Sequence, residues 1–148
     1  MRSMHRRAFS LIELVIVVVI IGIIAAIAIP RMSRGATGAA ENSLKANLSL
    51  LRSQLELFQT ENGGNYPAVA KLAEALTGFS DGNGGTAPYA TTRPNGYPYG
   101  PYLREIPKLG IGANKDKNDF GATAGSNAWI YANNEIKANT GNATYDAW

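Results

Sequence analysis

Apolar residues dominate the chain directly after a short basic leader. Positions 14–29 carry no charge, and the stretch from Phe9 is interrupted only by Ser10 and Glu13. A helix needs about 20 mainly apolar residues to cross the hydrocarbon core of a bilayer. In lipid the backbone can satisfy its polar groups only within the helix. The pattern therefore predicts a membrane-spanning helix near the N-terminus.

A second apolar pattern follows, and it has the spacing of one face of a helix. Its positions are separated by 4, 3, 4 and 3 residues, which predicts an amphipathic helix with a single buried stripe. The helix is expected to end at Asn62-Gly63-Gly64. Two further leucines, Leu50 and Leu57, lie off the stripe and are either surface residues or contacts to another copy of the chain. The stripe consists of Leu44, Leu48, Leu51, Leu55 and Phe58.

The patterns after residue 62 are shorter-ranged. A helix is predicted over 68–78, and a long irregular segment rich in Gly, Pro and Tyr over 79–102. Strands over 129–132 and 135–139 flank Asn133-Asn134, and Asn tolerates the positive φ of a tight hairpin turn. The predicted fold class is α+β, in which a small antiparallel sheet packs on the C-terminal half of the long N-terminal helix.

Composition argues against an enzyme. The chain has no cysteine, and its one histidine, His5, precedes the apolar stretch. General acid–base catalysis and metal binding rely heavily on histidine, so catalysis would need carboxylates alone. The eleven Asp and Glu residues are scattered, without a close pair in an apolar setting. No catalytic residues are predicted.

The positive net charge belongs to the leader. Three of the fourteen Lys and Arg residues precede Phe9, so the remaining eleven balance the eleven Asp and Glu. A body without net positive charge gives no reason to expect nucleic acid as a partner. Basic residues directly before the apolar stretch favour a cytoplasmic N-terminus. The C-terminal part would then lie outside the cytoplasm.

Glu13 is the most informative residue of the N-terminal apolar segment. A carboxylate inside a membrane span is costly, so Glu13 is either a tolerated interfacial residue or one that awaits a positive partner. The run RRAFSLIELVIVVVIIGIIAAIAIP over 6–30 closely resembles the processing and methylation segment of type IV pilins and type II secretion pseudopilins. In that family the mature chain begins with Phe and has Glu as its fifth residue.

The resemblance implies a set of functional positions. A prepilin peptidase would cut between Ala8 and Phe9 and N-methylate Phe9, although the family usually has Gly where Ala8 stands. Glu13 would pair with the terminal amine of a neighbouring subunit during assembly. Gly22 and Pro30 match the positions where the family loosens and kinks its helix.

The implied organisation has four parts: a leader 1–8, an assembly helix 9–30, its amphipathic continuation 31–62 and a periplasmic domain 63–148. The resemblance implies a structural subunit of a type II secretion pseudopilus. Its partners would be the inner membrane, further copies in a helical filament, the prepilin peptidase, other pseudopilins and secretion-platform proteins. A type IV pilus subunit for adhesion, motility or DNA uptake is the alternative. A secreted soluble domain behind a signal peptide is a third reading.

Calcium is the one cofactor to consider. Major pseudopilins bind calcium in a C-terminal loop, and the resemblance therefore suggests Asp116 and Asp119 as ligands. The surrounding residues fail the EF-hand pattern, because Asp119 stands where Gly is needed and Gly125 where Glu is needed. A solvated turn rich in Asp and Asn would explain the same residues.

Overall fold

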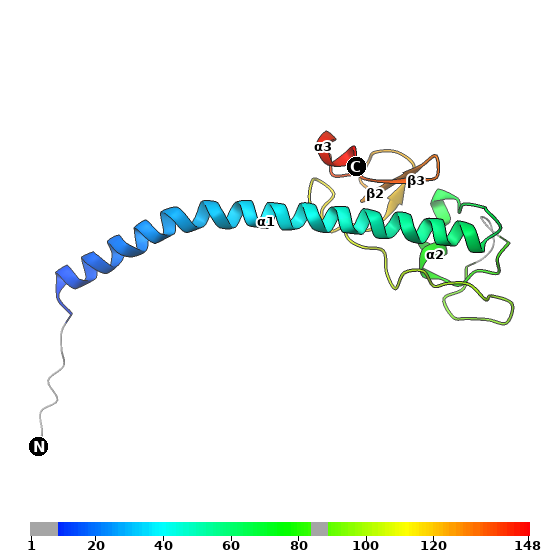
Figure 1. The fold of residues 1–148 in the computed structure, drawn as a ribbon, viewed down its shortest axis with the longest axis horizontal. Coiled ribbons are helices and arrows are strands. Elements are labelled where there is room, and N and C mark those ends of the chain that lie inside the picture. Colours follow the sequence, from blue (N-terminus) through cyan, green and yellow to red (C-terminus); the bar gives the residue numbers. More distant parts are fainter. Residues whose placement is uncertain (1–8, 84–88) are drawn as a thin grey trace, which may run out of the picture. The chain divides into compact units, whose positions relative to one another are not determined.

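A computed structural model describes residues 9–83 and 89–148, with backbone alone at 30–34. The predicted leader 1–8 lies outside these ranges. The chain forms two compact units, Met1–Ala39 and Ala40–Trp148. The elements are α1 (Leu11–Glu61), η1 (Val69–Lys71), α2 (Leu72–Thr77), β1 (Phe120–Gly121), β2 (Trp129–Ala132), β3 (Glu135–Ala138) and α3 (Ala143–Asp146). Figure 1 labels the three α-helices and the strands β2 and β3.

Helix α1 covers both predicted helical segments and ends where the sequence predicts. The helix continues through Gly22 and position 30, so neither residue terminates it. After Glu61 the backbone turns left-handed at Gly63, with φ of 67°. The Gly64 N–H then donates to the Gln59 carbonyl at 2.8 Å, a bond that satisfies one of the last free carbonyls of the helix.

The predicted stripe on α1 forms the core of the second unit. Its five residues are each at most 3% exposed, whereas Leu50 and Leu57 are 42% and 44% exposed. Trp129 and Ile136 of the hairpin, both fully buried, belong to the same hydrophobic cluster. The amphipathic pattern thus selects the face of α1 on which the sheet packs, as predicted.

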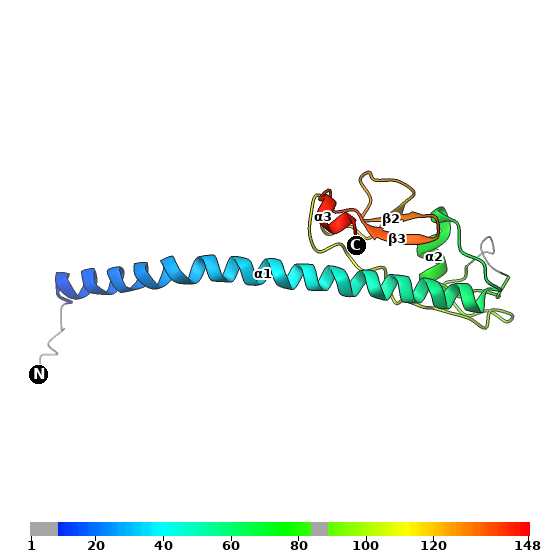
Figure 2. The ribbon, with the colours of Figure 1, turned by 45° about the horizontal axis from the view of Figure 1, so that its top comes forward.

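The sheet has the order β1-β2-β3. Strands β2 and β3 form the predicted antiparallel hairpin, in which Trp129 pairs with Ala138 and Ala132 with Glu135. Asn133 and Asn134 have φ of 53° and 63°, as a tight primed turn requires. Strand β1 adds a short parallel pair with β2, so the sheet is mixed rather than wholly antiparallel. Figure 2 shows α3 beside the β2–β3 hairpin.

The segment over 68–78 differs from the predicted single helix. It begins with the 3₁₀ turn η1 and becomes α-helical only at Leu72. Within α2 the buried residues are Leu72, Ala75 and Leu76, which have the i, i+3, i+4 spacing of one helix face, and Ala73 is exposed.

Two tyrosines hold the irregular segment after α2 to the core. Tyr89 and Tyr102 both meet the ring of Phe58 edge-on, with centroid separations of 6.0 and 5.5 Å. The Tyr102 hydroxyl also accepts a hydrogen bond of 3.1 Å from the Asn62 side chain. At these two positions the tyrosines pin the loop to the domain.

Candidate functional site

Helix α1 begins with a reciprocal pair of caps. The Ser10 hydroxyl accepts from the Ile12 N–H at 3.3 Å, and the Glu13 carboxylate accepts from the Ser10 N–H at 3.0 Å. This is the capping box S-x-x-E, in which two otherwise unpaired N–H groups of the first turn are satisfied. A carboxylate in the first turn also interacts favourably with the positive end of the helix dipole. Glu13 is therefore held by its own subunit at the start of the span.

The first turns of α1 lead into an unbroken apolar surface. Within α1, Leu11–Ile29 is long and apolar enough to cross a membrane, and none of this window is buried inside the structure. Phe9, just before it, is 84% exposed. Contiguous apolar surface of this extent requires lipid or another protein to cover it.

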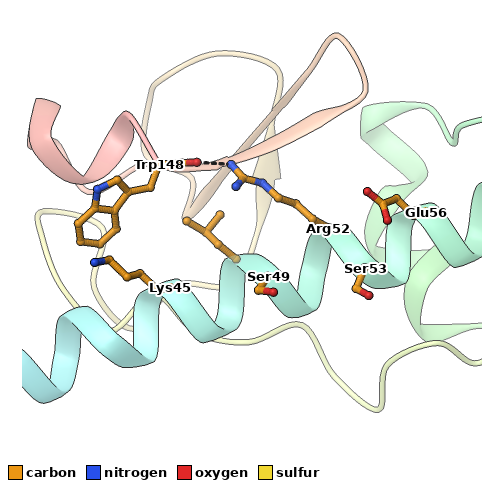
Figure 3. A pocket seen from close by; sticks show the side chains of 7 residues that line it. Lys45, Ser49, Arg52, Ser53, Glu56 and Trp148 are labelled. Carbon is orange, nitrogen blue, oxygen red and sulfur yellow. Dashed lines mark hydrogen bonds between the residues drawn. The ribbon is translucent and has the colours of Figure 1, made fainter.

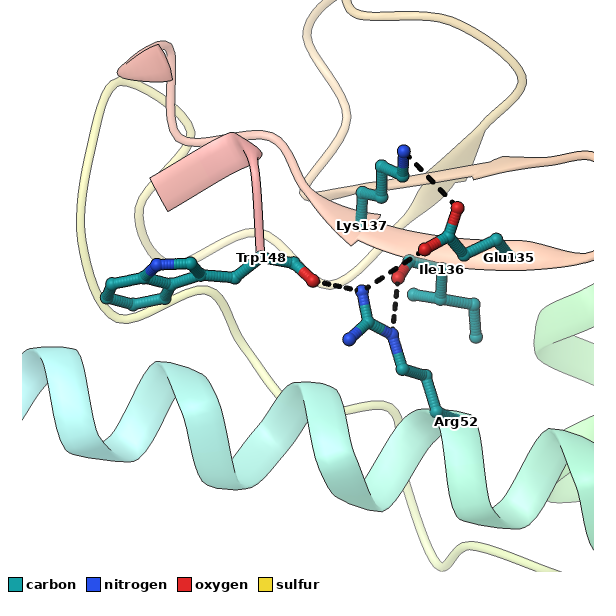
Figure 4. Close-up of polar contacts among 5 residues, drawn as sticks. All are labelled: Arg52, Glu135, Ile136, Lys137 and Trp148. Atoms are coloured by element: carbon teal, nitrogen blue, oxygen red, sulfur yellow. Dashed lines mark hydrogen bonds and ion pairs between the residues drawn. The ribbon is translucent and has the colours of Figure 1, made fainter. Parts of the chain in front are cut away.

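Arg52 joins α1 to the hairpin and to the C-terminal segment. Its Nε donates to the Ile136 carbonyl at 3.0 Å, and one Nη donates to the carbonyl of Trp148. The same guanidinium lies 3.8 Å from the carboxylate of Glu135, which also pairs with Lys137 at 3.2 Å. Figure 4 shows how the guanidinium reaches all three groups from α1.

An open groove of about 470 Å³ lies beside this network, along α1 (Figure 3). Its basic side chains are already engaged, because Lys45 lies 4.2 Å from the ring centre of Trp148 and Arg52 is bonded as described. Its other lining residues are Leu48, Ser49, Ser53 and Glu56. Among the described residues that line it, Glu56 is the one with a side-chain carboxylate.

Helix α3 is bonded to α1 on the N-terminal side of this groove, at Glu41. The Tyr145 hydroxyl donates to a Glu41 carboxylate oxygen at 2.7 Å. This hydrogen bond raises the pKa of Tyr145, since it stabilises the protonated phenol. Tyr145 also meets Trp148 edge-on at 5.2 Å. These contacts position the C-terminal residues and show no arrangement for chemistry.

Comparison with known proteins agrees with the N-terminal geometry. Residues 3–29 match the family described as prokaryotic N-terminal methylation motif. Over 103 residues the chain is 27% identical to the type II secretion system core protein G of Klebsiella pneumoniae, covering 70% of this chain and 67% of that protein. These similarities support a pilin-like protein. No solved structure matches it significantly.

The predicted processing residues lie where the described part of the chain begins. Ala8 falls outside the described residues, and Phe9 directly precedes the capping box. Cleavage between them and methylation of Phe9 stay predictions. Gly22 lies inside the exposed apolar span, and position 30 is also part of the helix. The predicted kink at Pro30 stays a prediction.

The two predicted calcium ligands, Asp116 and Asp119, lie in the loop before β1. Asp116 is exposed and has a left-handed backbone with φ of 68°. The Asp119 carboxylate accepts a 3.0 Å hydrogen bond from the Ala128 N–H. In the described ranges, no three acidic or histidine side chains gather as a metal site. As they stand, these residues do not fit the calcium site that the resemblance suggests.

Sequence reasoning missed two residues. Ser10 could have been found, because Ser followed three residues later by Glu before an apolar run is the pattern of a capping box. The spacing of Arg52 and Glu56 would allow an i,i+4 pair, but the guanidinium of Arg52 turns to Glu135 and Ile136 instead. No local signal marks those partners, which lie more than eighty residues later.

Proposed function

We propose that this pilin-like protein is a structural subunit of a type II secretion pseudopilus that polymerises through its N-terminal helix to support protein export. One observation carries the proposal: the methylation motif coincides with a capped helix whose apolar residues over Leu11–Ile29 are unburied in the single chain. The similarity to a type II secretion core protein supports export over a surface pilus.

An exposed apolar span suits such a subunit both in the membrane before assembly and in the filament afterwards. Before assembly, lipid covers the apolar side chains, and afterwards neighbouring helices do. Lipid tails are as apolar as these side chains, so hydrophobic burial alone drives little association. Close packing and the pairing of polar groups must then favour the filament, which gives Glu13 its importance.

The proposed location is the inner membrane, with a cytoplasmic N-terminus where a prepilin peptidase reaches the Ala8–Phe9 bond. The C-terminal unit would stand in the periplasm, beside other pseudopilins and the secretion platform. The proposed role is structural and involves no catalysis by this chain.

Deletion of the gene in its host provides the test. We expect folded export substrates to accumulate in the periplasm, while adhesion, surface motility and DNA uptake remain normal. Reintroduction of the wild-type gene should restore export. Normal export together with a loss of motility or DNA uptake would instead identify a type IV pilus subunit.

A further inference from the structure

The loop that carries the predicted calcium ligands folds around a lysine. The Lys117 ammonium donates to the side-chain oxygen of Asn114 at 3.1 Å and to the carbonyl of Ser126. These two oxygens come from opposite sides of the loop between Leu109 and β2. An ammonium group can donate three hydrogen bonds, so one lysine can join both sides.

Buried amides set the oxygen of Asn114 in place. Asn114 is 7% exposed, and its side-chain NH₂ donates to the carbonyls of Asn139 at 2.8 Å and Gly125 at 3.2 Å. Asn139, 3% exposed, donates in turn to the carbonyls of Asn127 at 2.7 Å and Gly125 at 3.2 Å. With its donors used in this way, Asn114 directs its oxygen to Lys117.

The main chain fixes Lys117 as well. The Leu109 N–H donates to the Lys117 carbonyl, and the Asp116 N–H donates to the Leu109 carbonyl, both at 2.8 Å. Close packing holds the neighbouring turn, because Gly112 has φ of 87° and a Cβ there would lie 2.2 Å from the Thr140 carbonyl oxygen. The lysine is therefore anchored at its backbone and at its ammonium group.

The oxygens that meet Lys117 are of the kind that calcium also uses, namely a main-chain carbonyl and a side-chain amide. Calcium requires six to eight oxygen ligands. A positive ammonium on the same oxygens would repel a divalent cation. The Lys117 ammonium is therefore the cation that these oxygens bind in this loop.

We propose that the Lys117 ammonium replaces a bound divalent cation in this loop, so that the Ala40–Trp148 unit reaches full stability without calcium. Lys117 then joins the Asn114 turn to the segment that leads into β2. This role concerns the stability of the unit and stands apart from the proposed secretion function.

The test is thermal unfolding of the full chain in detergent, followed by tryptophan fluorescence, since both tryptophans lie in this unit. Wild-type protein should have the same Tm in excess CaCl₂ and in EGTA. Lys117→Met, which keeps an apolar stem but loses the charge, should lower Tm by about 4 °C or more. The exposed Lys115 of the same loop gives the matched control, and Lys115→Met should leave Tm almost unchanged.

Two results would overturn the proposal. One is a rise in the wild-type Tm on adding calcium; the other is an equal effect of Lys117→Met and Lys115→Met. Should Lys117→Met fail to fold, Lys117→Arg decides, because it keeps the positive charge. Folding of Lys117→Arg supports the proposal, whereas its failure to fold shows that charge is not what the position requires.

Discussion

The carboxylate of Glu13 has one observed partner and one proposed partner. One oxygen accepts from the Ser10 N–H in the capping box. A carboxylate can accept several hydrogen bonds, so the terminal amine of a neighbouring Phe9 could be added without breaking the cap. The cap would also hold the carboxylate at a fixed depth before assembly. The observed cap and the proposed pairing in assembly can therefore be separated by substitution of one side chain.

Two substitutions separate them. Glu13→Val removes cap and charge, and Glu13→Gln keeps a capping acceptor but loses the charge. If charge pairing drives assembly, both variants should insert and be processed but form no filaments, because an unpaired buried amine costs about 3–5 kcal/mol. Glu13→Asp should retain partial assembly if its shorter side chain still reaches the amine.

Filaments sheared from overexpressing cells, compared with subunit levels in the membrane, measure the outcome. Wild-type filament yields from Glu13→Gln would reject charge pairing and leave capping as the role of Glu13. Normal filaments from Glu13→Val would reject both roles.

Burial of Tyr131 leads us to expect that the second unit loses folding stability at alkaline pH. The side chain is 5% exposed, and burial raises its pKa to about 12. An unfolded tyrosine ionises near pH 10, so the folded state holds its proton more tightly. The resulting stability is complete below pH 10 and is lost as the pH rises from 10 to 12. Burial raises the pKa of Tyr102 to about 12 as well, which adds to the same loss.

Tyr131→Phe should therefore weaken the pH dependence of stability in this range, since Phe has no proton to lose. Urea unfolding followed by tryptophan fluorescence at several pH values above 10 measures it. An unchanged dependence in the variant would show that other groups cause the alkaline unfolding.

At the scale of elements, α1 carries two different faces in its C-terminal half. The adjacent residues Leu50 and Leu51 lie on different faces, since Leu51 is fully buried and Leu50 is 42% exposed. Leu51→Asp should destabilise the unit by at least about 3 kcal/mol, because it removes a core side chain and buries an unpaired charge. Leu50→Asp should change stability by no more than about 0.5 kcal/mol.

Chemical unfolding of the two variants, monitored by circular dichroism, tests this difference. Equal stabilities would contradict the assignment of the core face. Leu50→Asp also answers a question of function: if the variant folds but forms no filaments, Leu50 contacts another subunit, and normal filaments would make it a tolerated surface leucine.

The predictable elements are those whose signals are local. The stripe on α1 repeats every three or four residues, and Asn133-Asn134 marks the hairpin turn, so both follow from the sequence. Strand β1 does not, because Phe120 and Gly121 are too few to show alternation. The bond from Lys117 to Ser126 joins residues nine positions apart across an irregular loop, and no periodicity predicts such a contact.

For the whole molecule, the predicted processing would change charge and surface together. Removal of residues 1–8 would take away the excess positive charge and leave the apolar span at the very start of the chain. We predict that mass spectrometry of protein extracted from its native membrane shows a chain beginning at N-methylated Phe9. Ala8→Gly should be processed at least as well, whereas a bulky residue at position 8 should block cleavage.

An intact Met1 in the native host would contradict processing. A mature chain that starts near Ile29 would instead identify a secreted domain released from a signal peptide. The catalytically active peptidase must be present, so the same protein made in cells without it provides the negative control.

The contacts of α1 also determine the order in which the second unit can fold. Glu41 bonds to a residue 104 positions later, and Arg52 to one 84 positions later. Such distant closures are entropically costly and make folding slow compared with a helical bundle of local contacts. During synthesis the leucine face of α1 must wait for β2 and β3 before it is covered. The nascent subunit therefore passes through a stage in which this face is open to aggregation, and anchoring in a membrane would keep its copies apart during that interval.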